Sequence, residues 1–244
     1  TNGNWSTPQT VTVTGVDDAL ADGSQSTTIT MSVKDASSDD NFDALADQTV
    51  SATTTDNDTA AFTLGAISGT VAETGTTATF TVVLDVQPVG NVVIDVTSGD
   101  TGEATVSAAE LTFTTGNWDT PQTVTVTGVD DNIIDGSINT TITMAVVDAS
   151  SDDNFDGVAD QTVTATTTDN DSASFALGAI SGTVAETGTT ATFTVVLGAQ
   201  PDSDVVISVT SGDTGEATVS AAELTFTNGN WSTPQTVTVT GVDD

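Results

Sequence analysis

The sequence lacks cysteine, histidine and tyrosine, and Lys34 is its single basic residue. Without cysteine, neither a disulfide framework nor a thiolate metal site can form. Without cysteine and histidine, the serine hydroxyls also have no base that could activate them as nucleophiles. No aromatic sugar platform accompanies the carboxylates that a glycosidase would use. We therefore expect that the protein is not an enzyme.

Positive charge is almost absent, whereas the chain carries 35 acidic residues and a formal net charge of -34. A phosphate backbone would be repelled, which excludes nucleic acid as a partner, and an anionic membrane surface is disfavoured for the same reason. Apolar runs that approach the ~20 residues of a membrane span are also absent. We expect no direct insertion into a membrane.

High charge with few aromatic residues is typical of disordered chains, but the apolar residues of this sequence follow a period of two. Hydrophobic residues make up 36% of the chain. In TATFTVVL, Ala78, Phe80, Val82 and Leu84 fall on one face and threonines on the other. A half-buried β-strand needs this alternation and a disordered segment does not.

A long internal repeat organises the sequence. The segment GNWSTPQTVTVTGVDD at Gly3 returns with one change at Gly116 and unchanged at Gly229, a period of 113 residues both times. A period of this length indicates whole domains in tandem. Placing the boundary after each DND triplet divides the chain into the trailing part of a repeat (1–58), a complete repeat (59–171) and the leading part of another (172–244).

Many short strands, no helical period and about 110 residues per unit predict tandem Ig-like antiparallel β-sandwiches, an all-β fold. Gly, Asp, Asn and Pro separate the strands. In the complete repeat the expected strands lie near residues 60–64, 67–72, 77–84, 91–97, 103–106, 110–114, 121–128, 138–148 and 160–168.

Carboxylates gather where strands end, in the segments VDDNIIDG, TTDND, TVAE and SGDTGE. In a sandwich these loops can converge at one pole. Two carboxylates ~4 Å apart repel by about 4 kcal/mol at an effective dielectric near 20, so several converging carboxylates need a cation. Oxygen ligands without nitrogen or sulfur suit Ca²⁺. The alternative is an acidic surface without a specific site, of the kind found in halophiles.

A second acidic segment, SSDDNFD, occurs at residues 37–43 and again at 150–156. It is interpreted as a long hairpin loop around Phe42 or Phe155. A turn fixed by one aromatic residue and an additional calcium site both fit this pattern.

The motif NWxTPQTVTVTGVDD, together with ISGTVAETGTTATFTVVL, SGDTGEATVS and TTTDND, closely resembles Calx-β domains. Such domains occur in sodium-calcium exchangers and in tandem in large bacterial surface adhesins of the repeats-in-toxin type, and the likeness between the copies resembles the adhesin arrays. The resemblance covers the whole repeat. It implies a seven-stranded sandwich that holds calcium in acidic loops at one end, next to the interdomain linker.

The resemblance also implies which residues bind calcium. Asn170 stands where many members of the family carry a third aspartate, which lowers the expected number or affinity of bound ions. The expected ligands are Glu73, Asp100, Asp130, Asp131, Asp135, Asp169 and Asp171 in the complete repeat, Asp17, Asp18, Asp22, Asp56 and Asp58 before it, and Glu186, Asp213, Asp243 and Asp244 after it.

The function expected from these observations is that of structural extender repeats in a secreted bacterial surface adhesin, stiffened by calcium between neighbouring repeats of the same chain. The alternatives are a calcium-sensing regulatory module and an acidic matrix or filament protein. Residues 1–58 and 172–244 are complementary pieces of one repeat. They belong to a longer parent, or they complete each other between molecules and give head-to-tail self-association.

Overall fold

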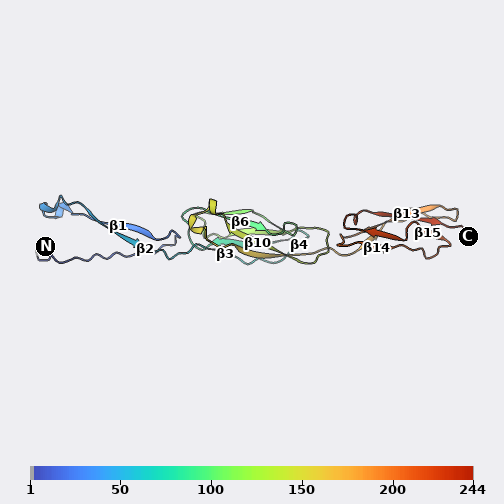
Figure 1. The fold of residues 1–244 in the computed structure, drawn as a ribbon, viewed down its shortest axis with the longest axis horizontal. Helices are drawn as coiled ribbons and strands as arrows, with labels where there is room; N and C mark the ends of the chain where they lie inside the picture. Colours follow the sequence, from blue (N-terminus) through green and yellow to red (C-terminus); the bar gives the residue numbers. More distant parts are fainter. Residues whose placement is uncertain (1–2, 244) are drawn as a thin grey trace.

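The computed structural model describes residues 3–243, and alternating threonine and apolar residues form β-strands in each of its three repeat units. The elements in this range are strands and 3-10 turns, with no α-helix. No helix in the described part of the chain is long and apolar enough to cross a membrane. Figure 1 shows an elongated molecule with a hairpin at the N-terminal end, a closed middle unit and a third group of strands at the C-terminal end.

The middle unit is a sandwich of two sheets. All neighbouring strands pair antiparallel except β4 and β11, which run parallel. The four-stranded sheet contains, in spatial order, β3 (Phe62–Leu64), β5 (Thr77–Leu84), β9 (Gln122–Gly128) and β7 (Ala104–Val106). The five-stranded sheet contains β4 (Val71–Ala72), β11 (Gln161–Thr168), β10 (Ile138–Val146), β6 (Val92–Ser98) and β8 (Glu110–Phe113). The expected all-β sandwich class is confirmed.

The middle unit has nine strands, one in each of the nine segments expected from the sequence. The family resemblance implied seven, and the difference arises because two segments change sheets. Segment 62–72 contributes β3 to the smaller sheet and β4 to the larger one, and segment 104–113 contributes β7 and β8 in the same way. Strands that switch sheets close the corners of a sandwich. Both sheets lie within the predicted range 59–171.

The core of the middle unit consists of the apolar face of each alternating strand. Val82, Val124, Ile94 and Met144 are fully buried, and they come from both sheets. Burial of such a side chain stabilises the fold by roughly 1.5–3 kcal/mol. Truncation of Phe80, which is 2% exposed, to alanine would cost about 3–5 kcal/mol.

The N-terminal unit is a single hairpin of β1 (Gln25–Met31) and β2 (Gln48–Thr54). Residues 9–15 have the sequence QTVTVTG that forms β9, but they form no strand here. In the middle unit β9 pairs with β5 and β7, and the chain contains no copy of those strands before residue 9. Val11 and Val13 are therefore 72% and 51% exposed.

The C-terminal unit repeats the first part of the middle unit and lacks counterparts of β10 and β11. Residues 184–185, at the repeat position of β4, form no strand because the partner strand is missing. One sheet contains β12 (Phe175–Leu177), β13 (Thr190–Leu197), β17 (Gln235–Gly241) and β15 (Ala217–Val219), and the other contains β14 (Val205–Ser208) and β16 (Glu223–Phe226).

Short 3-10 turns occur in the hairpin loops. η1 (Asp35–Ser37) and η2 (Asp40–Phe42) follow β1, and η3 (Asp148–Ser150) and η4 (Asp153–Phe155) follow β10. The two pairs occupy the same positions of the repeat, so the loop keeps its local conformation whether or not a sandwich surrounds it.

Neighbouring units contact each other through the same two loops at both junctions. Leu20 forms a parallel bridge with Gln87, and Ile133 forms the equivalent bridge with Gln200. The backbone N–H of Gln200 donates to the carbonyl of Asn132 at 2.7 Å. At each junction the loop that follows the QTVTVTG segment thus lies against a turn of the following unit, next to the DND segment.

Candidate metal centre

Four acidic loops meet at the pole of the middle unit that precedes the C-terminal unit. They follow β4, β6, β9 and β11. A Cβ atom at Gly128 would collide with the carbonyl oxygen of Ala72, so glycine is needed where the end of β9 approaches β4. This close approach brings Glu73, the next residue after Ala72, toward the loop that follows β9.

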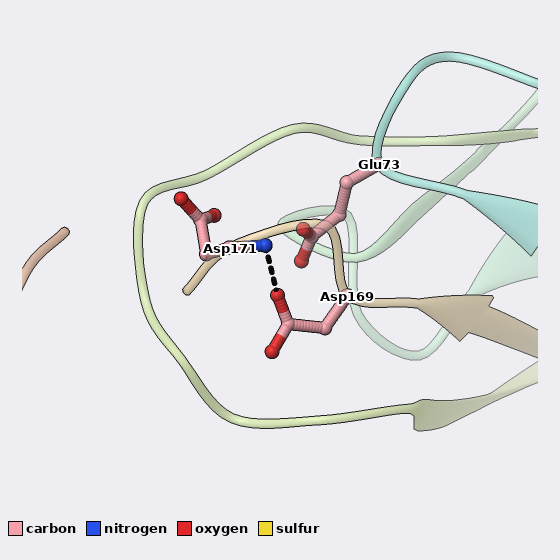
Figure 2. Close-up of side chains that lie close together, drawn as sticks. All are labelled: Glu73, Asp169 and Asp171. Carbon is pink, nitrogen blue, oxygen red and sulfur yellow. Dashed lines mark hydrogen bonds between the residues drawn. The ribbon is translucent and has the colours of Figure 1, made fainter. Parts of the chain in front are cut away.

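The first carboxylate group consists of Glu73, Asp169 and Asp171, each of which offers an oxygen within 4.8 Å of the others (Figure 2). Glu73 is only 2% exposed. Its Oε2 accepts a hydrogen bond from the backbone N–H of Asn170 at 2.9 Å, and Asp169 Oδ1 accepts one from the N–H of Asp171 at 2.6 Å. These bonds hold the DND segment in a turn around the buried glutamate.

The second group consists of Glu103, Asp131 and Asp135, with the same 4.8 Å limit between their oxygens. Glu103 is 9% exposed, and its backbone carbonyl accepts hydrogen bonds from the N–H of Val129 and the hydroxyl of Thr167. The residue that follows β9 and a threonine side chain of β11 therefore fix the position of this second glutamate. Glu73 and Glu103 are called the buried glutamates below.

The electrostatic environment penalises negative charge on both buried glutamates. Burial, followed by the charges of Asp169, Asp131 and Asp171, raises the pKa of Glu73, although the hydrogen bond from Asn170 opposes the rise. Burial also raises the pKa of Glu103, with Asp135 and Asp131 as the strongest neighbours. Asp131 acts on both glutamates, so the two groups repel each other as well.

Asp169 and Asp171 respond to this environment in opposite ways. Hydrogen bonds from the N–H groups of Asp171 and Gly136 lower the pKa of Asp169. Burial, followed by the charges of nearby aspartates, raises the pKa of Asp171. Asp171 Oδ2 is buried without a hydrogen-bond partner. This buried carboxylate oxygen makes no hydrogen bond that would compete with a cation for it.

The chemistry of the two groups fits a hard divalent cation. Each group provides three carboxylates, and neither includes nitrogen or sulfur. Ca²⁺ accepts six to eight oxygen ligands in flexible geometry, whereas Mg²⁺ demands a near-ideal octahedron. Burial and the charges of Asp131 and Asp169 raise the pKa of Asp135, and Asp202 of the following unit adds a smaller effect. The candidate site therefore lies at the junction of two units.

Two of the expected ligands in the complete repeat, Asp100 and Asp130, belong to neither group. Asp130 is exposed and accepts a hydrogen bond from Asn170 Nδ2 at 2.9 Å, so the asparagine connects two acidic loops. Asp100 accepts from the N–H of Gly102. Glu103 was missing from the expected ligands, although it belongs to the acidic SGDTGE segment; its position directly before a strand could have identified it.

The five expected ligands of the N-terminal unit form no such group within residues 3–243. Asp56 accepts hydrogen bonds from the N–H groups of Asp22, Gly23 and Asp58, at 3.0, 2.7 and 2.7 Å. This turn matches the one around Asp169. The glutamates that complete each group come from the leading part of a repeat, which this unit does not contain. The five expected ligands of this unit are Asp17, Asp18, Asp22, Asp56 and Asp58.

The C-terminal unit contains the two glutamates but lacks the strands that would cover them. Glu186 and Glu216 occupy the repeat positions of the buried glutamates, but both are exposed. Asp213 and Asp243 are also exposed, and Asp244 lies outside the described residues. The strands that cover the glutamates of the middle unit, β10 and β11, have no counterpart here. Closure of the sandwich is thus what buries the two glutamates.

The second acidic segment has the structure of a turn. The Asp152 carboxylate accepts hydrogen bonds from the N–H groups of Val89, Gly90 and Asn154, at 2.6, 2.9 and 3.1 Å. Phe155 is fully buried. Backbone donors already occupy the carboxylate, which favours the turn interpretation over an additional calcium site.

Comparisons with known proteins identify no relative by sequence. No family model matches the chain, and no curated protein matches it. Several solved structures match the chain, all at low similarity. The chain resembles CBD12 from CALX1.2 with a TM-score of 0.31 and 16% identity, covering 75% of each chain.

Two further structures have comparable scores. Domains 1-6 of the surface layer protein SbsC give a TM-score of 0.32 and 19% identity, over 79% of this chain and 23% of that one. A protein of unknown function from Porphyromonas gingivalis W83 gives a TM-score of 0.32 and 8% identity, over 74% of this chain and 83% of that one. The functional argument therefore rests on the residues of this chain.

Proposed function

We propose that the chain consists of non-catalytic extender repeats of a secreted bacterial surface adhesin, and that calcium bound between successive units stiffens them. The observation that carries the proposal is the pair of buried glutamates, each within 4.8 Å of two aspartates at a unit junction. Such a site is unfavourable without a cation, and a cation held there would stabilise the junction. The bacterial and extracellular setting comes from the family resemblance of the sequence.

Stiffening is the contribution that near-identical repeats can make together. Identical copies cannot each recognise a different target, but in series they set the distance between the two ends. At each junction a bridge between backbone segments already joins the units. Calcium held by Asp169 and Asp171 would fix the short connection between β11 and β12, which otherwise bends as a flexible linker.

Small-angle scattering tests this mechanism. We expect calcium to increase the maximum dimension of the dilute protein relative to the chelated protein, and to narrow the distribution of shapes. Magnesium at equal ionic strength controls for general charge screening. Asp171→Asn should abolish the response, whereas Asp148→Asn, which removes an equal charge outside both groups, should preserve it. An unchanged maximum dimension in calcium would refute the stiffening mechanism.

A further inference from the structure

Identical repeat positions differ in exposure between the middle and C-terminal units, and the difference shows which surface is uncovered. Phe62 is 2% exposed, whereas Phe175, at the same repeat position, is 56% exposed. Val92 is fully buried, and its counterpart Val205 is only half-buried. In the middle unit β10, β11 and the loop between them cover this face. The C-terminal unit has no such hairpin.

The uncovered face contains an apolar cavity of about 470 Å³. Strand β14 forms one of its walls, and β14 pairs only with β16, so its other edge is open. An open edge beside an apolar cavity is a surface to which another strand can be added. The apolar residues of the cavity include Ile134, Phe175, Leu197, Pro201, Val205 and Ile207.

The N-terminal hairpin has the sequence and register of the missing piece. β1 and β2 pair as β10 and β11 do, with every pair shifted by 113 residues, as in Gln25 with Thr54 and Ile138 with Thr167. Its apolar residues are exposed for lack of a sandwich. Phe42 is 54% exposed, whereas Phe155, at the same repeat position, is fully buried.

We propose that the C-terminal unit binds the N-terminal hairpin of a second copy of this chain, so that the two partial units complete one sandwich. The middle unit supplies the register: Met144 pairs with Val96, and Val146 with Ile94. Transferred by one repeat, Met31 of the second copy pairs with Val209. Phe42 of the second copy then fills the cavity as Phe155 fills the core of the middle unit.

The proposed register brings together one pair of opposite charges that the middle unit does not have. Val147 donates its N–H to the carbonyl of Val93, so Asn91 is its diagonal neighbour. The counterpart of Val147 in the hairpin is Lys34, the only cation of the chain, and the counterpart of Asn91 is Asp204. The proposed register places Lys34 diagonal to Asp204, where a long side chain can reach the carboxylate.

The interface joins molecules head to tail. The hairpin and the C-terminal unit lie at opposite ends of the elongated molecule, so one copy cannot close on itself (Figure 1). The two surfaces differ, which makes the contact heterologous and allows growth into chains. A further repeat within a longer polypeptide would fill the same place in the same register; in the 244-residue chain the hairpin comes from a second copy.

Sedimentation velocity of the 244-residue protein over a wide concentration range tests the proposal. Chelator is present, so the outcome does not depend on the proposed calcium sites, and moderate salt screens the net charge of -34. We expect a concentration-dependent series of oligomers. Phe42→Ala should weaken association by on the order of 100-fold, because it removes the residue that fills the cavity. A monomer at every concentration would overturn the proposal.

A charge exchange tests the register itself. Lys34→Asp and Asp204→Lys should each weaken association by about tenfold, since each replaces an attraction with a repulsion. The double variant should return to the wild-type association constant. Association that Phe42→Ala leaves unchanged, or a double variant weaker than both single variants, would show that another surface is responsible and would overturn the proposal.

Discussion

Glu73→Gln and Glu186→Gln change the same repeat position in two environments, which makes them a matched pair. Glu73 is 2% exposed and lies near two aspartates, whereas Glu186 is exposed and belongs to neither carboxylate group. Glutamine keeps the size and the acceptor for the N–H of Asn170 but removes the charge. The pair therefore separates loss of a calcium ligand from a general change in net charge.

The magnitude follows from linkage between binding and folding. Calcium at 100 times its dissociation constant stabilises the folded state by about 2.7 kcal/mol, and a site that binds tenfold more weakly keeps about 1.4 kcal/mol of this. We expect calcium to slow the amide hydrogen exchange that requires unfolding of the middle unit by about 100-fold, both in wild type and in Glu186→Gln. In Glu73→Gln we expect about tenfold. Without calcium, Glu73→Gln is at least as stable as wild type, because a penalised charge is removed.

Hydrogen exchange of the β10 and β11 amides, followed by mass spectrometry in dilute protein with calcium or chelator, measures this effect within the middle unit. Equal responses of the two variants would refute the assignment of Glu73 as a ligand. A wild-type protein whose β11 protection is unaffected by calcium would refute the site as a whole.

Three further outcomes are expected. Asp152→Ala should destabilise the middle unit by about 3 kcal/mol, because three backbone donors lose a charged acceptor. Asp39→Ala should leave the stability of the middle unit unchanged. Urea unfolding followed at the middle unit measures both effects. Because the pKa of each buried glutamate is raised in the folded state, protonation of these groups favours folding; this contribution is complete below the usual glutamate pKa and is lost as pH rises through the folded pKa. Chelated protein should therefore have a higher melting temperature at about pH 5 than at neutral pH. Calcium should raise the melting temperature most at neutral pH, where the ligands are ionised. Val126→Pro should unfold the middle unit and Val13→Pro should not, as circular dichroism would show, because only Val126 lies in a central strand.

The strands of the middle unit were predictable because alternation and turn residues act locally. The segment 77–84 forms β5 with the expected bounds, and 110–114 forms β8 over Glu110–Phe113. The sheet changes within 62–72 and 104–113 were not predictable, since they depend on which partner strand is nearest. The residue pattern predicted the nine strands, whereas the seven implied by the resemblance did not account for these sheet changes.

The candidate site was predictable in composition but not in geometry. Acidic loops at strand ends indicated the right pole, yet the contact between Glu73 and Asn170 joins residues 97 positions apart. Local sequence also does not determine by itself whether a segment forms a strand. QTVTVTG forms β9 and β17 but no strand at residues 9–15, where both partners are missing.

Burial of the glutamates and closure of the sandwich are therefore one event, and this couples the two proposals. Head-to-tail joining would cover Glu186 and bring Asp56 and Asp58 of the second copy to the positions that Asp169 and Asp171 hold around Glu73. A new calcium site would form at each joint, so calcium should strengthen association. Glu186→Gln should remove this increment and leave association in chelator intact. An association constant that sedimentation finds equal with and without calcium would separate the two proposals, because the hairpin would then complete the sandwich without completing a site.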